Sequence, residues 1–369
     1  RKSDTLARLG GDEFGLLLEG CSLERAQFIA ADLLAAVGDF RFRSEANLLT
    51  VGVSIGLATV TGDSTSSAEI LGMADTACYW AKEQGRNRVF VYRTGDSDMA
   101  IRRREMGWIA RINSALAAGR FTFYHQRFLP LNAAAGTRTH LEVLLRMIDE
   151  EGNLVQPGSF LPAAERYNLM PAIDRWVVGT MFARYHALVA ERGGAPLTCA
   201  INLSGTSLNA DGFLDFIRQQ ALQHALPPQS ICFEITETAA INNLRTAIEF
   251  IRECKSMGFL FALDDFGTGT SSFGYLKNLP VDYLKIDGGF VKNLEHDAID
   301  KAMTETINRI GHIMGLKTVA ENAENDAIIR ELKHIGVDYA QGYGVGLPTP
   351  LFESDLGPAL LPRGVAVAA

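Results

Sequence analysis

Two adjacent carboxylates, Asp264 and Asp265, end an apolar run over residues 259–263 and lead into a glycine-containing turn at residues 267–269. This pattern predicts a buried strand followed by an acidic loop. Neighbouring carboxylates could bridge two divalent ions about 3.5 to 4 Å apart, the arrangement used for in-line attack on phosphodiesters. A surface turn rich in Asp and Gly is the alternative interpretation.

A second short strand, over residues 281–286, follows Pro280 and delivers Lys285 and Asp287. These two side chains share a face because strand side chains alternate with a period of two residues. Burial of so much charge costs several kcal/mol for each unpaired ion. The pattern therefore indicates a metal, a paired network or a functional cleft.

The same arrangement recurs along the chain after residue 120, where short apolar segments end in polar residues. Strands are predicted over residues 121–128, 140–146, 197–203, 231–236, 259–263, 281–286, 316–320 and 337–340. The polar residues at or near their ends are Gln126, Glu142, Arg146, Asn202, Glu234, Glu237, Asp264, Asp265, Lys285, Asp287, Glu321, Glu324 and Gln341. An oxygen-rich set without His or Cys favours hard cations such as Mg²⁺ or Mn²⁺ over zinc.

Helical segments separate these strands, which is typical of an α/β protein with a largely parallel sheet. Eight strands suit a TIM-type (β/α)8 barrel, which usually takes about 250 residues and carries its active site at the C-terminal strand ends. An open doubly wound sheet is the structural alternative.

The sequence pattern over residues 1–93 predicts a separate α+β unit. Strands over residues 5–9 and 14–18 form a hairpin with an acidic tip, and a helix over residues 23–37 lies between the signals Ser22 and Gly38. A strand over residues 48–60, a helix over residues 68–84 and a strand over residues 88–92 follow. The predicted order is β-β-α-β-α-β.

Residues 94–119 predict a linker helix that carries three consecutive arginines at residues 102–104. We interpret these arginines as a solvated helix face, with a nucleic-acid site as the second interpretation.

Composition limits the possible partners and location. The chain has 369 residues, 47% hydrophobic content, a net charge of −8 and a pI near 5.5. The acidic balance disfavours nucleic acid but allows a small phosphate ligand held through cations. Five scattered cysteines without C-x-x-C spacing predict reduced thiols in a cytoplasmic protein. No apolar run approaches the roughly 18 residues that span a bilayer. The start at Arg1 predicts a longer parent, whose membrane anchor or sensor would lie upstream.

The motifs between residues 121 and 351 together resemble the EAL domain, a family of barrels that hydrolyse cyclic di-GMP to linear pGpG. They are EVLLR (142–146), INLS (201–204), EITE (234–237), DDFGTG (264–269), KID (285–287), AE-x-x-E (320–324) and QGY (341–343). Arg127, Val143, Thr270 and Ala323 depart from the family pattern, and none of them is a metal ligand.

The resemblance implies a role for each motif residue and two divalent cations, Mg²⁺ or Mn²⁺. The implied metal ligands are Glu142, Asn202, Glu234, Asp264, Asp265, Asp287 and Glu321. Lys285 and Glu321 would be catalytic, Lys285 by positioning and helping to deprotonate the attacking water. The implied substrate-binding residues are Gln126, Arg146, Glu324 and Gln341, and Glu237 would anchor the loop after Asp265. The resemblance also implies an antiparallel first strand and a homodimer through the EAL domain.

The GGDEF motif, Gly10, Gly11, Asp12, Glu13 and Phe14, resembles the diguanylate cyclase family, as do residues 53–58 and 74–87. The resemblance covers only the C-terminal half of such a domain, so this half is expected to be inactive as a cyclase. Arg1 and Asp4 fit the R-x-x-D feedback site of such domains. The implied boundaries are 1–93 for the partial GGDEF domain, 94–119 for the linker, 120–355 for the EAL barrel and 356–369 for a tail.

Three functions follow from these resemblances. The first is a metal-dependent cyclic di-GMP phosphodiesterase. The second is a non-catalytic receptor for the same nucleotide, which the intact ligand set argues against. The third is a full-length parent that acts as a bifunctional diguanylate cyclase and phosphodiesterase.

Overall fold

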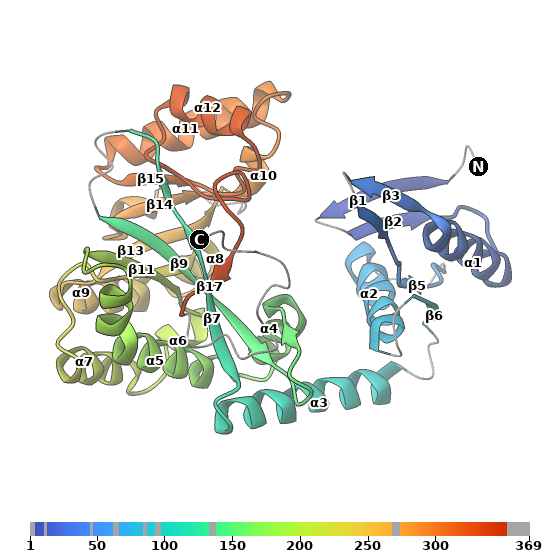
Figure 1. Ribbon diagram of the computed structural model, residues 1–369, viewed down its shortest axis with the longest axis horizontal. Coiled ribbons are helices and arrows are strands. Elements are labelled where there is room, and N and C mark those ends of the chain that lie inside the picture. The colour runs from blue at the N-terminus through green and yellow to red at the C-terminus, as the bar shows by residue number, and fades with distance from the viewer. Residues whose placement is uncertain are drawn as a thin grey trace. The chain divides into compact units, whose positions relative to one another are not determined.

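The computed structural model describes residues 4–10, 13–44, 47–61, 66–83, 87–92, 97–132, 138–267 and 274–352 (Figure 1). The chain divides into two compact units, residues 1–107 and 108–369. Of the residues singled out above, Arg1, Gly11, Asp12, Thr270 and the tail 356–369 lie outside the described part.

The N-terminal unit is an α+β fragment. Its elements are β1 (Thr5–Gly10), β2 (Glu13–Leu17), α1 (Leu23–Asp39), β3 (Arg41–Ser44), β4 (Asn47–Thr50), β5 (Ile55–Leu57), α2 (Ser67–Glu83) and β6 (Val89–Val91). Strands β1 and β2 are antiparallel, which confirms the predicted hairpin. Helix α1 begins after Ser22, whose Oγ accepts a hydrogen bond from the Arg25 N–H.

Two predictions for this unit are wrong. Helix α1 continues through Gly38 to Asp39, because a glycine weakens a helix without ending it unless the backbone turns left-handed there. The single strand predicted over residues 48–60 is two strands. Strand β4 pairs antiparallel with β3, whereas β5 pairs parallel with β6. One straight strand could not serve both partners. Strand β3 was not predicted either, so the observed order is β-β-α-β-β-β-α-β.

The C-terminal unit is a barrel. Its sheet contains β7 (Phe121–Arg127), β8 (Leu129–Pro130), β9 (Thr139–Ile148), β11 (Leu197–Asn202), β12 (Ile231–Thr236), β13 (Leu260–Phe266), β14 (Tyr283–Ile286), β15 (Lys317–Ala320) and β16 (Tyr339–Ala340), with the short strands β10 (Leu154–Val155) and β17 (Thr349–Pro350) paired to β9 and β7. In the order β9, β11, β12, β13, β14, β15, β16, each strand pairs parallel with the next.

The first strand closes this barrel and runs against the others. Strand β7 pairs antiparallel with β9, and its continuation β8 pairs antiparallel with β16 at the far end of the strand order. Backbone hydrogen bonds from Phe128 N to His140 O and from Leu131 N to Asp338 O extend the two contacts. The TIM-type barrel with an antiparallel first strand is therefore confirmed, and the open doubly wound alternative is wrong.

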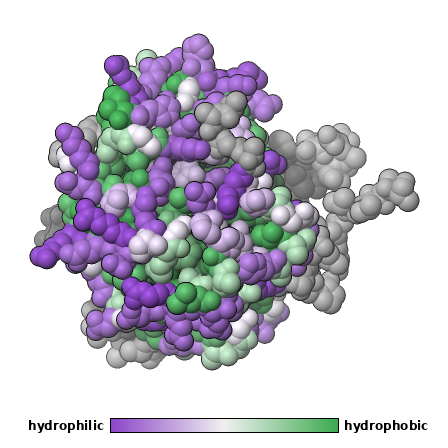
Figure 2. Space-filling model, turned by 90° about the vertical axis from the view of Figure 1, so that its left-hand side faces the viewer, coloured by the Kyte–Doolittle hydropathy of each residue, from purple (hydrophilic) through white to green (hydrophobic). Residues whose placement is uncertain are grey.

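Helices lie around the outside of the strands (Figure 1). In the C-terminal unit they are α4 (Pro157–Arg166), α5 (Met170–Glu191), α6 (Gly205–Leu208), α7 (Phe213–Gln223), α8 (Glu237–Asn242), α9 (Leu244–Ser256), α10 (Gly288–Val291), α11 (Ala298–Ile313) and α12 (Asp326–Ile335), with a short 3₁₀ helix at Leu276–Asn278. Helix α3 (Ser97–Ala117) contains the boundary at residues 107 and 108 where the two units divide. On the face that Figure 2 shows, hydrophobic residues lie in small groups among hydrophilic ones. Among the described helices, none is long and apolar enough to cross a membrane.

A layer of buried residues fills the barrel directly beneath the strand ends. Its members are Phe128, Ala200, Cys232, Ala262, Tyr283, Val319 and Tyr339. The ring of His140 lies among them, 5.2 Å from the Tyr339 ring and 5.5 Å from the Tyr283 ring. Burial lowers the pKa of His140 to about 4, so the imidazole is neutral. The layer is an apolar floor. The next inward-facing residue lies two positions later on each parallel strand and two positions earlier on the antiparallel first strand.

Candidate active site

A layer of polar side chains lies on this floor, because the residues two positions along each strand share its inward face. These residues are Gln126, Glu142, Asn202, Glu234, Asp264, Lys285, Glu321 and Gln341. In the pairing register, Gln126 lies opposite Glu142, and Asn202 lies opposite Glu234. The barrel therefore brings together one sequence-predicted site residue from each strand.

Lys285 joins the carboxylates of this layer. Its Nζ lies 3.0 Å from Glu234 Oε2, 3.0 Å from Asp264 Oδ1 and 2.8 Å from Glu321 Oε1, and the side chain is 1% exposed. Burial acts to lower the pKa of Lys285, but the surrounding carboxylates raise it well above its usual value. Lys285 is therefore a cation at neutral pH.

Burial has the opposite effect on the carboxyl groups. It raises the pKa of Glu321 to about 8, although Lys285 acts to lower it. It also raises the pKa of Glu234 well above its usual value. For Asp265, burial and the neighbouring charge of Asp264 both raise the pKa. The site holds more acidic groups than its single buried ammonium can neutralise.

A hydrogen-bonded chain of side chains orders the other half of the layer. Asn202 Nδ2 donates to Glu142 Oε1 at 2.8 Å, and Gln341 Nε2 donates to Glu142 Oε2 and, at 3.0 Å, to Gln126 Oε1. Gln126 Nε2 in turn donates to the Gly346 carbonyl at 2.8 Å. With its Nδ2 bonded to Glu142, Asn202 keeps its carbonyl oxygen available as a metal ligand.

Asp264 and Asp265 reach the same site although they are adjacent in sequence. A regular strand would point them to opposite faces. The register with β14 shifts between Leu263 and Phe266, and Asp265 has φ of 55°. The Asp265 N–H donates to Asp264 Oδ1 at 3.0 Å. This bulge turns Asp265 toward the site beside Asp264.

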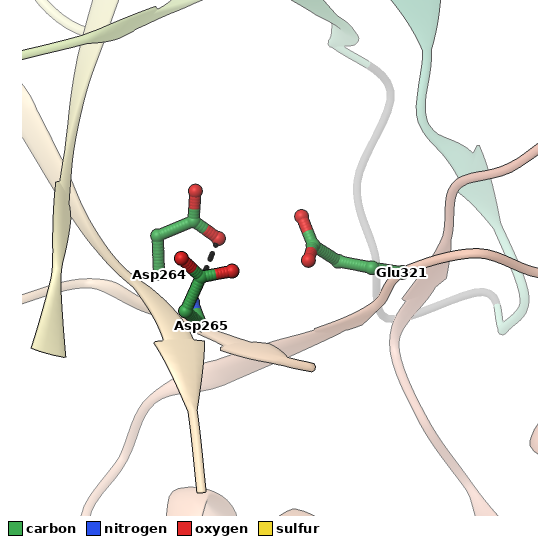
Figure 3. A group of neighbouring side chains, drawn as sticks. All are labelled: Asp264, Asp265 and Glu321. Atoms are coloured by element: carbon green, nitrogen blue, oxygen red, sulfur yellow. Dashed lines mark hydrogen bonds between the residues drawn. The ribbon is translucent and has the colours of Figure 1, made fainter. Parts of the chain in front are cut away.

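Asp264, Asp265 and Glu321 fit a metal site. One carboxylate oxygen from each lies within 4.8 Å of the other two, and Figure 3 shows Glu321 facing the two aspartates. Glu234 Oε1 and Gln341 Oε1 are buried, and neither has a hydrogen-bond partner among the described residues. Buried oxygens without donors and an excess of carboxylates both suit hard divalent cations. This donor set is compatible with divalent metal ions.

A pocket of about 140 Å³ opens beside the carboxylates. Its lining residues are Gln126, Glu142, Glu321, Asn322, Gln341, Gly342 and Tyr343. Arg146 is 8% exposed, and its guanidinium carbon lies 5.2 Å from the Tyr124 ring centroid. Its Nη1 donates to the Leu145 carbonyl, whereas its buried Nε has no partner among the described residues. A phosphate would provide such a partner.

The remaining candidates lie around this centre. Glu237 is 3% exposed and accepts a hydrogen bond from the Gly267 N–H at 3.0 Å, at the start of the loop after Asp265. Asp287 caps α10 and accepts from the Gly289 N–H at 2.8 Å. Glu324 is exposed on the loop after β15. In the N-terminal unit, Gly10 and Glu13 are paired at the end of the hairpin, and Phe14 is 63% exposed.

Asn322 was not predicted from the sequence. It lines the pocket beside Glu321 and has φ of 51°, a conformation that Asn adopts more readily than most residues. Its side chain lies over Gly288, where a Cβ would overlap the Asn322 amide. An Asn directly after a site glutamate, together with a Gly directly after Asp287, was the available signal.

Comparison with known proteins places this site in a family. Residues 109–348 match the model of the EAL domain, and residues 1–88 match that of the diguanylate cyclase, GGDEF domain. The chain is 41% identical over 349 residues to the cyclic di-GMP phosphodiesterase PdeB of Shewanella oneidensis, covering 94% of this chain and 40% of that protein. It is 34% identical over 350 residues to the bifunctional diguanylate cyclase/cyclic di-GMP phosphodiesterase MucR of Pseudomonas aeruginosa, covering 95% of this chain and 50% of that one. The chain thus spans half or less of these relatives' length.

Solved structures agree with the fold. The MucR phosphodiesterase in complex with cyclic di-GMP superposes with a TM-score of 0.61 at 34% identity, covering 66% of this chain and 98% of that one. The FimX EAL domain from Pseudomonas aeruginosa bound to cyclic di-GMP gives 0.61 at 28% identity, covering 66% and 96%. Because the EAL model matches most of its length, the chain belongs to the EAL-domain family and carries a GGDEF segment ahead of the barrel.

Proposed function

We propose that this chain hydrolyses cyclic di-GMP to linear pGpG with the help of two divalent cations, Mg²⁺ or Mn²⁺. The observation that carries the proposal is the cluster of Asp264, Asp265 and Glu321, whose oxygens lie within 4.8 Å of one another beside the buried ammonium of Lys285. The names of PdeB and MucR support the same activity.

In this proposal, the first cation is held by Glu142, Asn202, Glu234 and Asp264, the second is held by Asp265, and Asp287 and Glu321 support the pair. When bound, the cations supply Lewis-acid stabilisation and an acidified water. The geometry supports the first set because Asn202 and Glu142 are already hydrogen bonded at 2.8 Å.

The protein's own groups then position the reactants. Lys285 orients the attacking water. Its charge, which the raised pKa preserves, would help that water to lose a proton, and Glu321 would support the cations beside it. The water oxygen forms a bond to phosphorus, the bond from phosphorus to the 3′ oxygen breaks, and that oxygen takes up a proton. Arg146 would hold the phosphate, and Gln126, Gln341 and Glu324 would contact the rest of the ligand. Glu237 would fix the loop after Asp265.

The test is chromatography of cyclic di-GMP after incubation with this chain and Mg²⁺ or Mn²⁺. The expected result is conversion to pGpG, with none when Asp264→Asn replaces the parent. Tight binding without any conversion would instead support the receptor function, which the complete ligand set disfavours. No conversion and no binding would refute both.

The proposal also covers a longer protein of which this chain would be one part. The match of residues 1–88 to the GGDEF domain and the name of MucR support a parent that is also a cyclase. The inactivity of this half as a cyclase and the feedback site at Arg1 and Asp4 stay predictions. So do a homodimer through the barrel, a cytoplasmic location and the domain boundaries at residues 93, 119 and 355.

A further inference from the structure

Asp174 is a buried carboxylate that lies outside the polar layer of the barrel. It belongs to α5 and is 3% exposed, whereas the other buried residues of that helix are apolar or aromatic, such as Ile173, Val177 and Phe182. A buried carboxylate is costly unless it is well hydrogen bonded. Replacement by an apolar residue would extend the apolar face of α5, so the presence of Asp174 needs a specific reason.

The partners of Asp174 are Ser204, which follows β11, and Ser207 of the short helix α6. Its Oδ2 accepts hydrogen bonds from the Ser204 N–H at 2.9 Å, from Ser204 Oγ at 2.8 Å and from Ser207 Oγ at 2.6 Å. One carboxylate oxygen thus ties a backbone group and two hydroxyls to α5.

Capping of α6 does not explain this arrangement. Ser204 is already the N-cap of α6, and its Oγ accepts a hydrogen bond from the Ser207 N–H at 3.2 Å. A serine N-cap is sufficient for a helix start. The bonds to Asp174 therefore fix where the segment after β11 lies relative to α5, which the cap alone would not do.

This segment immediately follows a proposed metal ligand. Asn202 is the last residue of β11, two positions before Ser204. The intervening Leu203 N–H donates to the Glu234 carbonyl at 2.8 Å, so β12 holds one side of the segment and Asp174 holds the other. Asn202 Nδ2 reaches Glu142 only if this segment keeps its position.

We infer that Asp174 is a positioning residue of the metal site, acting through Ser204 and Ser207 to fix the carboxamide of Asn202. The inference rests on the proposed role of Asn202 as a metal ligand. Partners that orient metal ligands typically contribute about 10- to 100-fold to metal affinity or activity. Asp174 would supply such a contribution without contacting the metal or the substrate.

The test measures Mn²⁺ binding directly by titration calorimetry, with the folded fraction of each variant checked by circular dichroism. Asp174→Ala is expected to weaken Mn²⁺ binding about 10- to 100-fold, and Asp174→Asn by less, because its amide oxygen can still accept from the Ser204 N–H. Turnover of Asp174→Asn at saturating Mn²⁺ should approach that of the parent, so that the metal requirement rises more than kcat falls. Ser207→Ala, which removes one donor without changing charge, should weaken binding a few-fold and serves if Asp174→Ala does not fold.

Asp338 provides the matched control. It is 7% exposed, lies before β16 and likewise accepts from a backbone N–H and from side chains: Thr318 N at 2.9 Å, Thr318 Oγ1 at 3.2 Å and His312 Nε2 at 2.8 Å. Asp338→Asn should lower the melting temperature and leave the Mn²⁺ affinity unchanged.

Parental Mn²⁺ affinity in folded Asp174→Ala, or an equal loss in Asp338→Asn, would overturn the inference and leave the proposed function intact. Absence of Mn²⁺ binding in the parent protein would overturn the proposed function and this inference with it.

Discussion

Replacement of Lys285 by methionine tests the proposed catalytic role of this lysine against a role in charge balance alone. Methionine keeps most of the side-chain volume and removes the ammonium that lies within 3.0 Å of Glu234, Asp264 and Glu321. Removal of one partner from a buried ion pair usually costs about 3 to 5 kcal/mol, because the other charge is left uncompensated.

The lower end of this range applies to Lys285→Met without metal. The pKa of Glu321 is already raised to about 8, and that of Glu234 is raised well above its usual value, so both carboxyl groups can take up protons once the ammonium is gone. At about 2 to 4 °C per kcal/mol for a unit of this size, a loss of about 3 kcal/mol lowers the melting temperature by about 6 to 12 °C in chelator. Saturating Mg²⁺ replaces the missing positive charge, so most of this difference should disappear.

The decisive comparison is between nucleotide binding and turnover. Calorimetric titration of cyclic di-GMP in Ca²⁺ should give a Kd within a few-fold of the parent, whereas kcat in Mg²⁺ should fall by about 10² to 10⁴, the usual loss for an acid–base or positioning group. Lys255→Met is the control, because Lys255 pairs with Asp282 at 2.7 Å in a partly exposed position. It should cost at most about 1 kcal/mol and leave kcat unchanged. Parental turnover in Lys285→Met would remove Lys285 from the mechanism, and equal losses of binding and turnover would leave it only a charge-balancing role.

Three further outcomes are expected. A chelator should abolish hydrolysis, and added Mg²⁺ or Mn²⁺ should restore it. Ca²⁺ should restore it poorly, because the longer bonds of Ca²⁺ suit a close two-metal site badly. Full turnover in Ca²⁺ alone would contradict the two-metal mechanism. Without metal, the stability of the fold should fall as pH rises from about 5 to 8, because folded Glu321, with a pKa near 8, holds a proton that the unfolded chain has lost. Melting curves in chelator should show a smaller fall for Glu321→Gln. An equal fall in this variant would refute the raised pKa of Glu321 as the cause. Gly288→Ala should lower the free energy of unfolding by about 1 to 3 kcal/mol, because the new Cβ would overlap the Asn322 amide. Adding Asn322→Gly to this variant should restore the stability. A double variant that is no more stable would show that the strain lies elsewhere.

The barrel was predictable because each of its strands has a local sequence pattern. Each is a short apolar run, and seven of the eight end near a polar residue that the parallel arrangement brings to one edge. The closure was not predictable from pattern alone. It depends on the single stretch that forms β7 and β8, which pairs with β9 and with β16. Pairing between segments about 200 residues apart leaves no periodic signal in either one.

The site was predictable to the level of which side chains converge, and not to the level of how they are held. The convergence of Lys285 with several carboxylates could be predicted from their positions at strand ends. That its ammonium contacts three of these carboxylates depends on side-chain geometry, which the sequence does not show. Asp174 could not be found from the sequence, because a lone Asp in a helical segment looks like a surface residue. In the fold it is buried, and its partners Ser204 and Ser207 follow β11.

Asp264 and Asp265 show how a local irregularity creates the chemistry. Strand alternation would send one of the two carboxylates away from the barrel mouth. A prediction from alternation alone would place only Asp264 in the site. The register shift after Leu263 and the positive φ of Asp265 remove that alternation at one point. A non-glycine residue in this conformation costs about 1 to 3 kcal/mol unless its surroundings impose it. The strained backbone places a second carboxylate beside the first within reach of Glu321, as the proposed site for two cations requires.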